Sequence, residues 1–342
     1  MLSSFGIFAQ EVSLATSLKK YEIAPVPFLN YNKLIGFGIG AAPIVLYQAS
    51  KNDTISPKSV SGILAAYATN GSFVFSGFTK LYLNEDEWRI TAAGGIGKFN
   101  FQFYEQESDL PIGSFYDYES DFRVIGARLE KQVWNDFYIG AAFGFTRSVI
   151  TFENIPEDQI VRNQALQLSF ISDSRSNVYY PRKGHLAKFL TNFRPDWLAN
   201  ASTNYNVELV YNKYFPVRNN KDVIAARARA DVGLGDIEFN QEVIIGRTDL
   251  RGYTDGKYRG ERVFTLQGEY RWNFANRWSA VGFGGIATLD GSVNESFNWD
   301  LYPSIGSGIR FNIFKKDRLN IGIDGALGKD DFNLYFRIGE AF

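Results

Sequence analysis

Long runs in which apolar and polar residues alternate constrain this chain more than any other feature. In residues 262–274 the apolar residues Phe264, Leu266, Tyr270, Trp272 and Phe274 alternate with Thr265, Gln267, Glu269, Arg271 and Asn273. Successive side chains of a β-strand point to opposite faces, so this pattern predicts a strand with one apolar and one polar face. The run of thirteen residues exceeds the roughly nine to eleven that a tilted strand needs to cross a bilayer.

Sixteen strands of this kind can be placed along the chain. Their approximate ranges are 34–47, 59–70, 72–83, 88–104, 117–134, 137–152, 163–174, 184–194, 203–217, 222–235, 239–246, 262–274, 277–290, 300–314, 318–328 and 331–342. An even number of strands is typical of a closed bacterial barrel, because closure leaves no unpaired backbone in lipid. We therefore predict an all-β fold, a 16-stranded antiparallel transmembrane β-barrel. The alternative is a soluble β-sandwich, whose strands usually have about five or six residues.

The composition is typical of a transmembrane barrel. The chain has 19 Tyr, 30 Phe, 32 Gly and no Cys, and its mean hydropathy is −0.19. Aromatic girdles enrich a barrel in these rings, while a polar residue at every second position lowers the mean hydropathy. No run approaches eighteen apolar residues, which argues against membrane-spanning helices. The net charge of −1 predicts no nucleic-acid partner.

The first residues indicate export. Residues 1–9 are apolar around Phe5 to Phe8 and end in a small residue, which is typical of the end of a secretory signal peptide. Because a basic leading region is missing, we interpret them as a truncated signal, with an apolar mature tail as the alternative. Residues 10–33 are predicted to be a short periplasmic lead-in, and residues 34–342 the barrel. We expect an integral protein of the bacterial outer membrane, in contact with lipid and lipopolysaccharide.

Residues for catalysis or metal binding are scarce. His185 is the only histidine of a chain without Cys, so neither a His-based triad nor a multi-histidine metal site can be assembled. The glycines at 36, 38 and 40 lack the third spacing and the helix of a dinucleotide-binding loop. No Gly-x-Ser-x-Gly turn for a nucleophilic serine occurs. We expect no enzyme activity, no cofactor and no metal.

The loop before residue 262 carries a motif. Residues 250–262 read Leu-Arg-Gly-Tyr-Thr-Asp-Gly-Lys-Tyr-Arg-Gly-Glu-Arg. Arg251, Gly252 and Tyr253, followed by Tyr258 and Arg259, resemble the inward-folded sixth extracellular loop of the BamA/TamA superfamily of outer-membrane assembly factors.

Other stretches extend this resemblance to residues 24–342. Residues 173–177, 180–184 and 193–198 resemble the central stretch of the surface-antigen barrel domain of that superfamily. Residues 24–27, together with Gly36, Gly38 and Gly40, resemble the first strand of barrels fused to patatin-like lipases. Superfamily members usually carry POTRA repeats or a patatin-like domain ahead of the barrel. The sequence shows neither, so it resembles the subgroup without an N-terminal domain.

The resemblance implies that Arg251 enters the lumen and meets a carboxylate on the inner wall. A cation in a confined channel needs such a partner to offset the cost of its desolvation. Glu269 and Asp324 both lie on predicted inward faces. Because Gly285 occupies a wall position that often holds Asp in the superfamily, Glu269 is the favoured partner. The alternative places Arg251 in a mobile, solvated outer loop.

The seam, where the first and last strands of the barrel meet, is expected to be weak. The predicted first strand, 34–47, contains Gly36, Gly38, Gly40 and Pro43, which are poor strand formers, and proline cannot donate a ladder hydrogen bond. In the superfamily such a gate is thought to admit nascent barrel strands or to pass polypeptide.

The last strand resembles the terminal recognition signal of an outer-membrane barrel. It ends in Phe342 after lipid-facing residues at every second position, and Glu340 is expected on the same face, as a departure from the pattern. The resemblance as a whole implies a factor that assists the insertion or translocation of proteins or lipids, as a homodimer or with another envelope protein. A passive pore or structural barrel without insertase activity is the alternative.

Overall fold

The computed structural model describes residues 21–32, 36–105, 114–152, 158–238, 241–246, 250–254, 257–314 and 317–342. Within these ranges β-strands dominate, with short 3-10 turns at Asp196–Leu198 and Glu295–Phe297. No described helix is both long enough and apolar enough to span a membrane.

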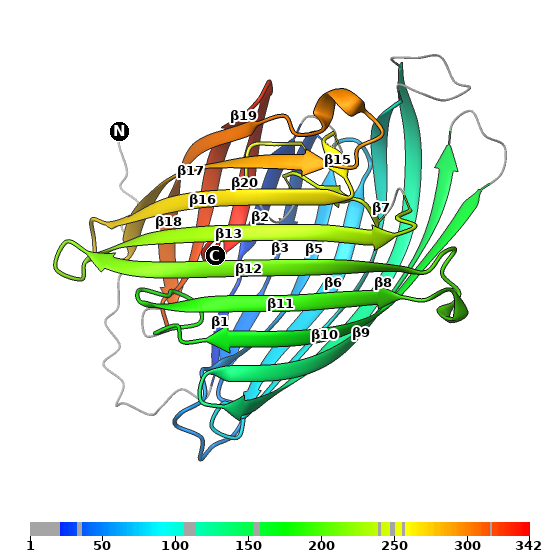
Figure 1. Cartoon of the computed structure of the whole chain (residues 1–342). Helices are drawn as coiled ribbons and strands as arrows, with labels where there is room; N and C mark the ends of the chain where they lie inside the picture. The colour runs from blue at the N-terminus through cyan, green and yellow to red at the C-terminus, as the bar shows by residue number, and fades with distance from the viewer. Residues whose placement is uncertain are drawn as a thin grey trace, which may run out of the picture.

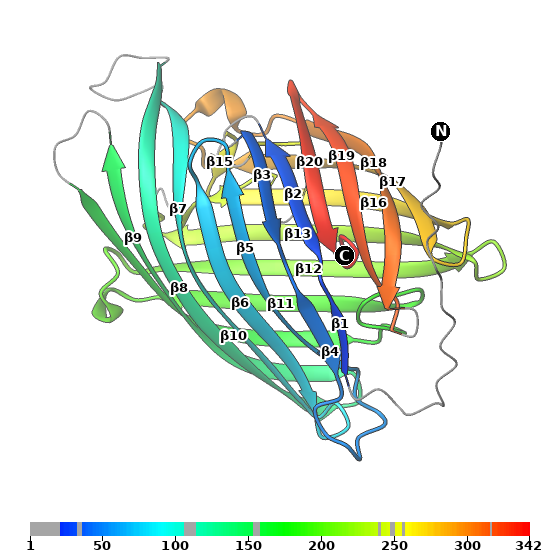
Figure 2. The same ribbon diagram turned by 180° about the vertical axis from the view of Figure 1, so that it is seen from behind.

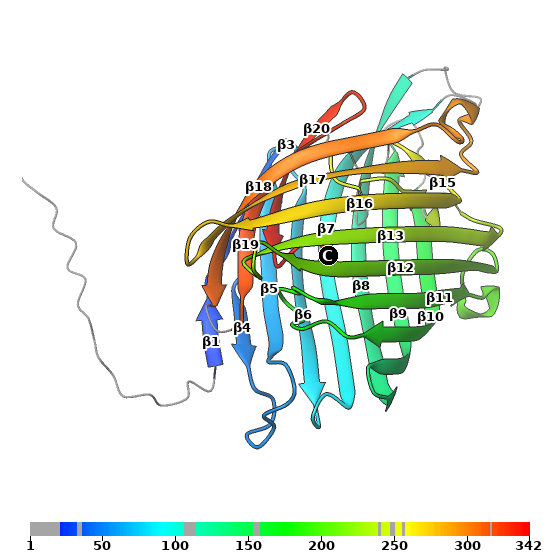
Figure 3. The ribbon, with the colours of Figure 1, turned by 60° about the vertical axis from the view of Figure 1, so that its left-hand side comes forward.

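Eighteen strand segments form one large antiparallel sheet that curves round an interior (Figure 1). They are β1 (Tyr21–Ala24), β2 (Pro27–Asn32), β3 (Gly36–Ala41), β4 (Ile44–Tyr47), β5 (Ser59–Ala68), β6 (Phe73–Leu83), β7 (Trp88–Glu105), β8 (Ser114–Trp134), β9 (Phe137–Phe152), β10 (Gln159–Asp173), β11 (Gly184–Arg194), β12 (Asn204–Val217), β13 (Asp222–Gly235), β16 (Arg262–Asn273), β17 (Trp278–Asp290), β18 (Tyr302–Phe314), β19 (Leu319–Gly328) and β20 (Asp331–Ile338). In Figure 3, β11 to β17 cross in front of β5 to β9, so that the two groups of strands form opposite walls.

Two pairs of these segments are halves of interrupted strands. β1 pairs with β4 and β2 pairs with β3, and one register runs from Tyr21↔Tyr47 to Asn32↔Gly36 without a shift. The interruptions fall at residues 25–26 and 42–43, where Pro25 and Pro43 lack the N–H that a ladder needs. Since β1 with β2, and β3 with β4, each count as one strand, the wall has sixteen strands.

The predicted strand count is confirmed, but two of the predicted assignments are wrong and compensate for each other. Residues 21–32, expected in the periplasmic lead-in, form the first strand. Within the expected strand 239–246, only Val243–Ile244 (β14) is strand among the described residues, and it pairs with Arg259–Gly260 (β15) instead of joining the wall. The prolines concealed the first strand. In the apolar run 243–245, Ile245 is buried in the interior and Val243 packs partly against the same cluster. An apolar run that packs as part of an inward loop looks the same in the sequence as one that forms a strand of the wall.

Alternation separates the two faces of the wall as the sequence predicted. In β16, Leu266, Tyr270 and Trp272 are exposed, whereas Glu269 and Arg271 are buried in the interior. Apolar side chains therefore cover the outside of the sheet, which is the arrangement a lipid bilayer requires.

The two ends of the barrel differ. We call the end that carries residues 236–261 and 291–301 the loop end. The opposite end carries the short turns at 218–221 and 274–277, and we call it the turn end.

The seam lies between β2 and β20, not between residues 34–47 and β20 as predicted. Figure 2 shows β2 and β20 side by side, yet the described residues share one register pair, Tyr31↔Leu334. On its other edge β20 forms a continuous ladder with β19, from Ile321↔Ile338 to Gly328↔Asp331. The glycine-rich β3 lies one strand further in and pairs with both β2 and β5. The missed first strand thus accounts for the misplaced seam.

Candidate functional site

The long loop folds into the barrel, as predicted. Leu250, Arg251, Tyr253 and Tyr258 are each at most 4% exposed. The apolar members of this group pack against wall residues of β16, β17 and β18, namely Val263, Ala287, Leu289 and Tyr302. Tyr258 lies closest to Tyr302, with ring centroids 4.7 Å apart.

Backbone contacts hold the loop against β18 to β20. The Gly252 N–H donates to Tyr335 Oη at 2.8 Å, and the Thr254 N–H donates to Asp331 Oδ2 at 2.6 Å. Ser304 Oγ donates to the carbonyl of Arg251. Gly252 has φ +104°, and a Cβ there would lie 2.7 Å from the carbonyl carbon of Leu327. Only glycine combines this conformation with so close an approach.

Arg251 joins two carboxylates on different strands. Its Nη2 donates to Glu269 Oε2 of β16 at 2.8 Å, and its Nη1 donates to Asp324 Oδ2 of β19 at 2.7 Å. Its Cζ lies 3.3 Å from the ring centroid of Phe283, so a cation–π contact adds to the two ion pairs. The structure therefore brings together Arg251 and both of the predicted wall carboxylates.

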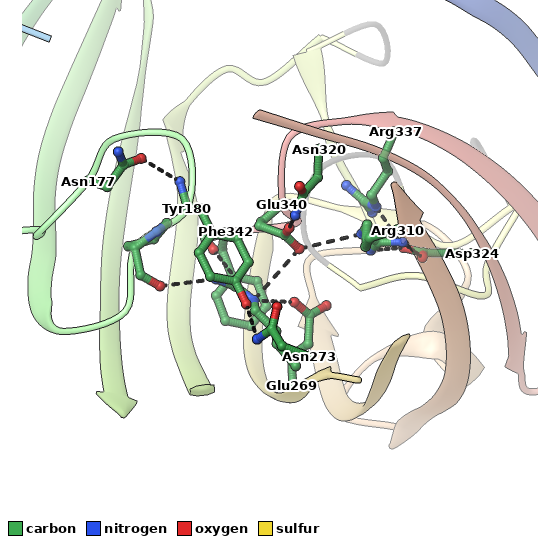
Figure 4. Close-up of polar contacts among 12 residues, drawn as sticks. Asn177, Tyr180, Glu269, Asn273, Arg310, Asn320, Asp324, Arg337, Glu340 and Phe342 are labelled. Carbon is green, nitrogen blue, oxygen red and sulfur yellow. Dashed lines mark hydrogen bonds and ion pairs between the residues drawn. The ribbon is translucent and has the colours of Figure 1, made fainter. Parts of the chain in front are cut away.

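Three further arginines surround the same carboxylates. Arg271 Nε donates to Glu269 Oε1 at 2.8 Å, and Arg337 Nε donates to Asp324 Oδ2 at 2.8 Å. Arg310 donates to both oxygens of Asp324 (Figure 4).

A third carboxylate, Glu340, extends this network toward the turn end. It lies 3.4 Å from Arg310 Nε and 3.7 Å from Arg271 Nε, and it accepts a hydrogen bond from Asn320 at 2.6 Å (Figure 4). We call the four arginines and three carboxylates the lumen network: Arg251, Arg271, Arg310, Arg337, Glu269, Asp324 and Glu340. Buried charges persist when each is paired and hydrogen-bonded, and here the pairing ties the loop to β16, β18, β19 and β20. Among the described residues, no three His, Cys, Asp or Glu side chains are grouped to hold a metal ion.

Two further residues named in the sequence analysis, Arg259 and Gly285, make contacts within the loop and between the loop and the wall. Arg259 Nε lies 3.5 Å from Glu242 Oε2, so its ion pair stays within the loop. At Gly285, a Cβ would lie 2.7 Å from Leu250 Cδ1 and 2.6 Å from the carbonyl oxygen of Leu266. The loop therefore fills the wall position at which an Asp was considered, and Asp324 supplies the second carboxylate from another strand.

The end of β20 departs from the prediction. Strand pairing stops at Ile338, and Gly339, with φ +87°, turns the chain inward. Glu340, expected on the lipid face, thus joins the lumen network. Phe342 is 8% exposed and packs in the interior with Tyr180, Tyr214, Val223 and Ala225. Phe342 therefore lies in the interior and not in the lipid-facing row, because the glycine breaks the alternation.

The sequence did not single out Arg271, Arg310 and Arg337 as site residues. The sequence contained a pattern that could have indicated them, since each lies on the inward face of its strand and carries the charge opposite to that of Glu269 or Asp324. Which inward residues meet across a barrel depends on strand tilt and stagger, and the strand pattern alone does not give these.

At the seam, side chains replace backbone pairing toward the turn end. The rings of Phe28 and Phe336 meet edge to face, with centroids 6.0 Å apart. A buried apolar cluster joins the β1–β5 side of the seam to Phe314 and Leu319 on the other side.

An ion-pair clasp also crosses the seam. Lys58, just before β5, places Nζ 2.6 Å from Glu22 Oε1 of β1 and 2.8 Å from Asp317 Oδ2 of the β18–β19 turn. We call these three residues the Lys58 clasp. It links the two sides of a junction that has little backbone pairing.

A family model described as the Omp85 superfamily domain matches residues 90–342, well over half of the chain. The chain belongs to the Omp85 superfamily. This confirms the resemblance to the BamA/TamA superfamily of outer-membrane assembly factors, and this Omp85 protein is an integral outer-membrane β-barrel. No curated protein sequence matches it significantly.

Solved structures show the same fold at low sequence identity. CdiB from Escherichia coli is 9% identical, with a TM-score of 0.65 over 95% of this chain and 63% of CdiB. CdiB from Acinetobacter baumannii is 12% identical, with a TM-score of 0.62 over 94% of this chain and 60% of CdiB. BamA from Haemophilus ducreyi lacking POTRA domains 1–3 is 13% identical, with a TM-score of 0.57 over 92% of this chain and 69% of BamA. This chain thus spans about two thirds of the length of these proteins.

Proposed function

We propose that this Omp85 barrel assists the insertion or translocation of polypeptides at the outer membrane through the seam between β2 and β20. The observation that carries the proposal is the single register pair, Tyr31↔Leu334, at this junction. By comparison, β16 and β17 pair continuously from Arg262↔Asp290 to Asn273↔Ser279. Unpaired backbone in lipid is costly, and an exposed strand edge is a template for another strand. A client strand would pair with the backbone N–H and C=O groups that β2 leaves unpaired at this edge.

The side-chain contacts across the seam suit a gate that closes between clients. An apolar cluster and a clasp of partly exposed ion pairs can separate without breaking a ladder of backbone hydrogen bonds. A continuous ladder would have to be broken one hydrogen bond after another. The geometry therefore supports opening at β2–β20 in preference to any junction with a full ladder.

The lumen network favours this lateral route over a passive pore. The inward loop and its ion pairs occupy the interior on the side of β16 to β20. A strand that entered along the barrel axis would have to displace buried charges, whereas a strand that entered at the seam would not. We further propose that the barrel acts as a homodimer or with another envelope protein, in contact with outer-membrane lipid and lipopolysaccharide, because members of the family act with other envelope proteins.

A disulfide lock tests the proposed route. The chain has no Cys, so Tyr31→Cys with Leu334→Cys introduces one defined pair across the seam. A second pair, Leu266→Cys with Ile286→Cys, joins two neighbours in the continuous β16–β17 ladder and serves as the control. Assembly of a client barrel into proteoliposomes is the measurement.

We expect oxidation to abolish client assembly only in the seam variant, and a reducing agent to restore it. Full assembly by the locked seam variant would rule out the lateral route. Mild-detergent extraction followed by native mass spectrometry tests the oligomeric proposal separately.

A further inference from the structure

A polar hollow of about 400 Å³ opens at the turn end. Four separate segments line it: the loop before β11, the β12–β13 turn, the β16–β17 turn and the β18–β19 turn. It lies beside the Glu340 end of the lumen network, because Asn320 lines the hollow and donates a hydrogen bond to Glu340, but it has its own set of charges. The proposed gating function does not involve it.

Four cations line the hollow, and none of them forms an ion pair with a described residue. They are Arg182, Lys221, Arg277 and Arg318. Arg182 Nη2 is buried and has no hydrogen-bond partner among the described residues. Arg182 is half-buried, whereas Lys221, Arg277 and Arg318 are exposed. Water screens the repulsion among the exposed charges in part, and a bound anion would offset it further.

The carboxylates next to these cations in the chain, and Glu340 beside the hollow, are engaged elsewhere. Asp222 pairs with Arg218 at 2.8 Å, and Asp317 pairs with Lys58 at 2.8 Å. Glu340 has a side chain only 2% exposed and pairs with arginines of the lumen network. Among the described residues, these three carboxylates therefore do not supply the missing negative charge.

Neutral hydrogen-bonding side chains also line the hollow. They are Tyr180, Asn273, Ser279, Asn312 and Asn320. Asn273 Nδ2 is fixed by hydrogen bonds to Tyr180 Oη and to the carbonyl of Lys221, both at 2.8 Å. Side-chain amides and guanidinium groups together are typical of sites that bind oxyanions.

Aromatic side chains on the outer surface beside the hollow indicate the depth of the hollow in the membrane. Trp272, Phe274 and Trp278 belong to the same β16–β17 hairpin and are 44–47% exposed on the outside of the barrel. Tryptophan rings at the end of a membrane strand lie at the level of the lipid headgroups. The cations of the hollow therefore lie near the plane where the phosphates of one leaflet are found. Three of the four are arginines, whose planar guanidinium groups match phosphate oxygens.

We propose that this hollow binds a phosphate group. Two sources share that chemistry, the headgroup of an anionic phospholipid in the leaflet at the turn end and free phosphate. The bound phosphate would join Arg182, Arg277 and Arg318, and so hold three turns of the barrel together. The site is distinct from the seam and from the lumen network.

The test compares the triple variant Arg182→Gln, Arg277→Gln, Arg318→Gln with the wild type. Arg162→Gln is the control, because Arg162 is an exposed cation at the loop end of β10. Equal heat-modifiable gel mobility shows that all three proteins are folded. One arm reconstitutes each protein in nanodiscs of phosphatidylcholine with phosphatidylglycerol and measures the retained lipid by native mass spectrometry. The other arm titrates detergent-solubilised protein with inorganic phosphate in a calorimeter.

We expect the wild type and Arg162→Gln to bind, and each lost charge-assisted contact to weaken binding about tenfold. Preferential retention of phosphatidylglycerol identifies the headgroup as the source. Binding of inorganic phosphate without lipid retention identifies free phosphate. Unchanged binding by the triple variant overturns the proposal. Binding of a glutamate-rich peptide, with neither phosphate source bound, also overturns it and assigns the hollow to an acidic polypeptide.

Discussion

At the scale of single residues, the lumen network has more cations than anions. Arg251, Arg271, Arg310 and Arg337 share Glu269, Asp324 and Glu340. Removal of Arg251 would leave each carboxylate with another guanidinium, whereas removal of Asp324 would leave three arginines without their common partner. Because an uncompensated buried charge costs more than a lost attraction, the two substitutions have unequal effects.

We expect Asp324→Asn to lower the free energy of unfolding most, by about 3–5 kcal/mol, and Arg251→Met to lower it less. The double variant should lose less than the sum of the two, because its members contact each other. Unfolding in urea, followed by tryptophan fluorescence, is the measurement. A larger loss for Arg251→Met than for Asp324→Asn would contradict the charge argument.

Gly252 allows a second test at this scale. Gly252→Ala places a Cβ 2.7 Å from the Leu327 carbonyl carbon at φ +104°, and such backbone strain costs on the order of 1–3 kcal/mol. We expect the loop to detach in part and to become sensitive to added protease. Gly268→Ala is the matched control, since a Cβ there meets nothing within 4 Å. Equal protease resistance of the two variants would show that the close approach is unimportant.

The sequence located the centre of the lumen network but not its extent. Arg251 could be found from its motif, and Glu269 and Asp324 from their inward positions on alternating strands. Arg310 and Arg337 were missed because their meeting with Asp324 depends on how neighbouring strands are staggered. Glu340 was placed on the wrong face because the turn at Gly339 interrupts the period of two.

At the scale of elements, alternation predicted most strands of the wall well, with two exceptions: the first strand, which prolines interrupt, and the inward segment 239–246. β16 was predicted at 262–274 and spans Arg262–Asn273. The strand formed by β1 and β2 was missed because Pro25 and Pro27 conceal it, although Tyr21, Ile23, Leu29 and Tyr31 are exposed at alternate positions. Proline is tolerated at a strand edge that lacks a partner, so the feature that hid this strand from the sequence is also one that weakens the seam.

Replacing Lys58 should loosen the seam. Burial lowers the pKa of Lys58, but hydrogen bonds and attraction from Asp317 and Glu22 outweigh it, so its pKa is raised above the ordinary value. A raised pKa means that the clasp contributes its full stability below the ordinary lysine pKa and loses it as the pH rises through the raised value. The clasp is therefore intact at neutral pH.

We expect Lys58→Met to accelerate amide exchange in β1 and β2 at neutral pH, by an amount that corresponds to about 1 kcal/mol or less for each ion pair. β16 and β17 should not change. Lys98→Met, which removes a pair with Glu119 between β7 and β8, is the control. Faster exchange throughout the barrel would indicate general destabilisation, and unchanged exchange in β1 would mean that the clasp does not hold the seam.

At the scale of the whole molecule, the interior and the seam have opposite characters. The interior beside β16 to β20 is filled by the inward loop, the lumen network and Phe342. The seam has one register pair and a set of separable side-chain contacts. Sixteen strands would otherwise enclose a water-filled channel. Because the interior is filled, ions and polypeptides are not expected to pass along the barrel axis.

This arrangement predicts that the barrel conducts ions poorly unless the loop is released. In planar bilayers we expect small, irregular conductance from the wild type and a large, steady conductance from Arg251→Ala with Gly252→Ala, because this variant loses the ion pairs and the close backbone approach together. Arg162→Gln, at an exposed position outside the network, should behave like the wild type. If the wild type already shows large, steady conductance and the double substitution does not change it, the loop does not block the lumen, and the passive-pore alternative replaces the lateral route.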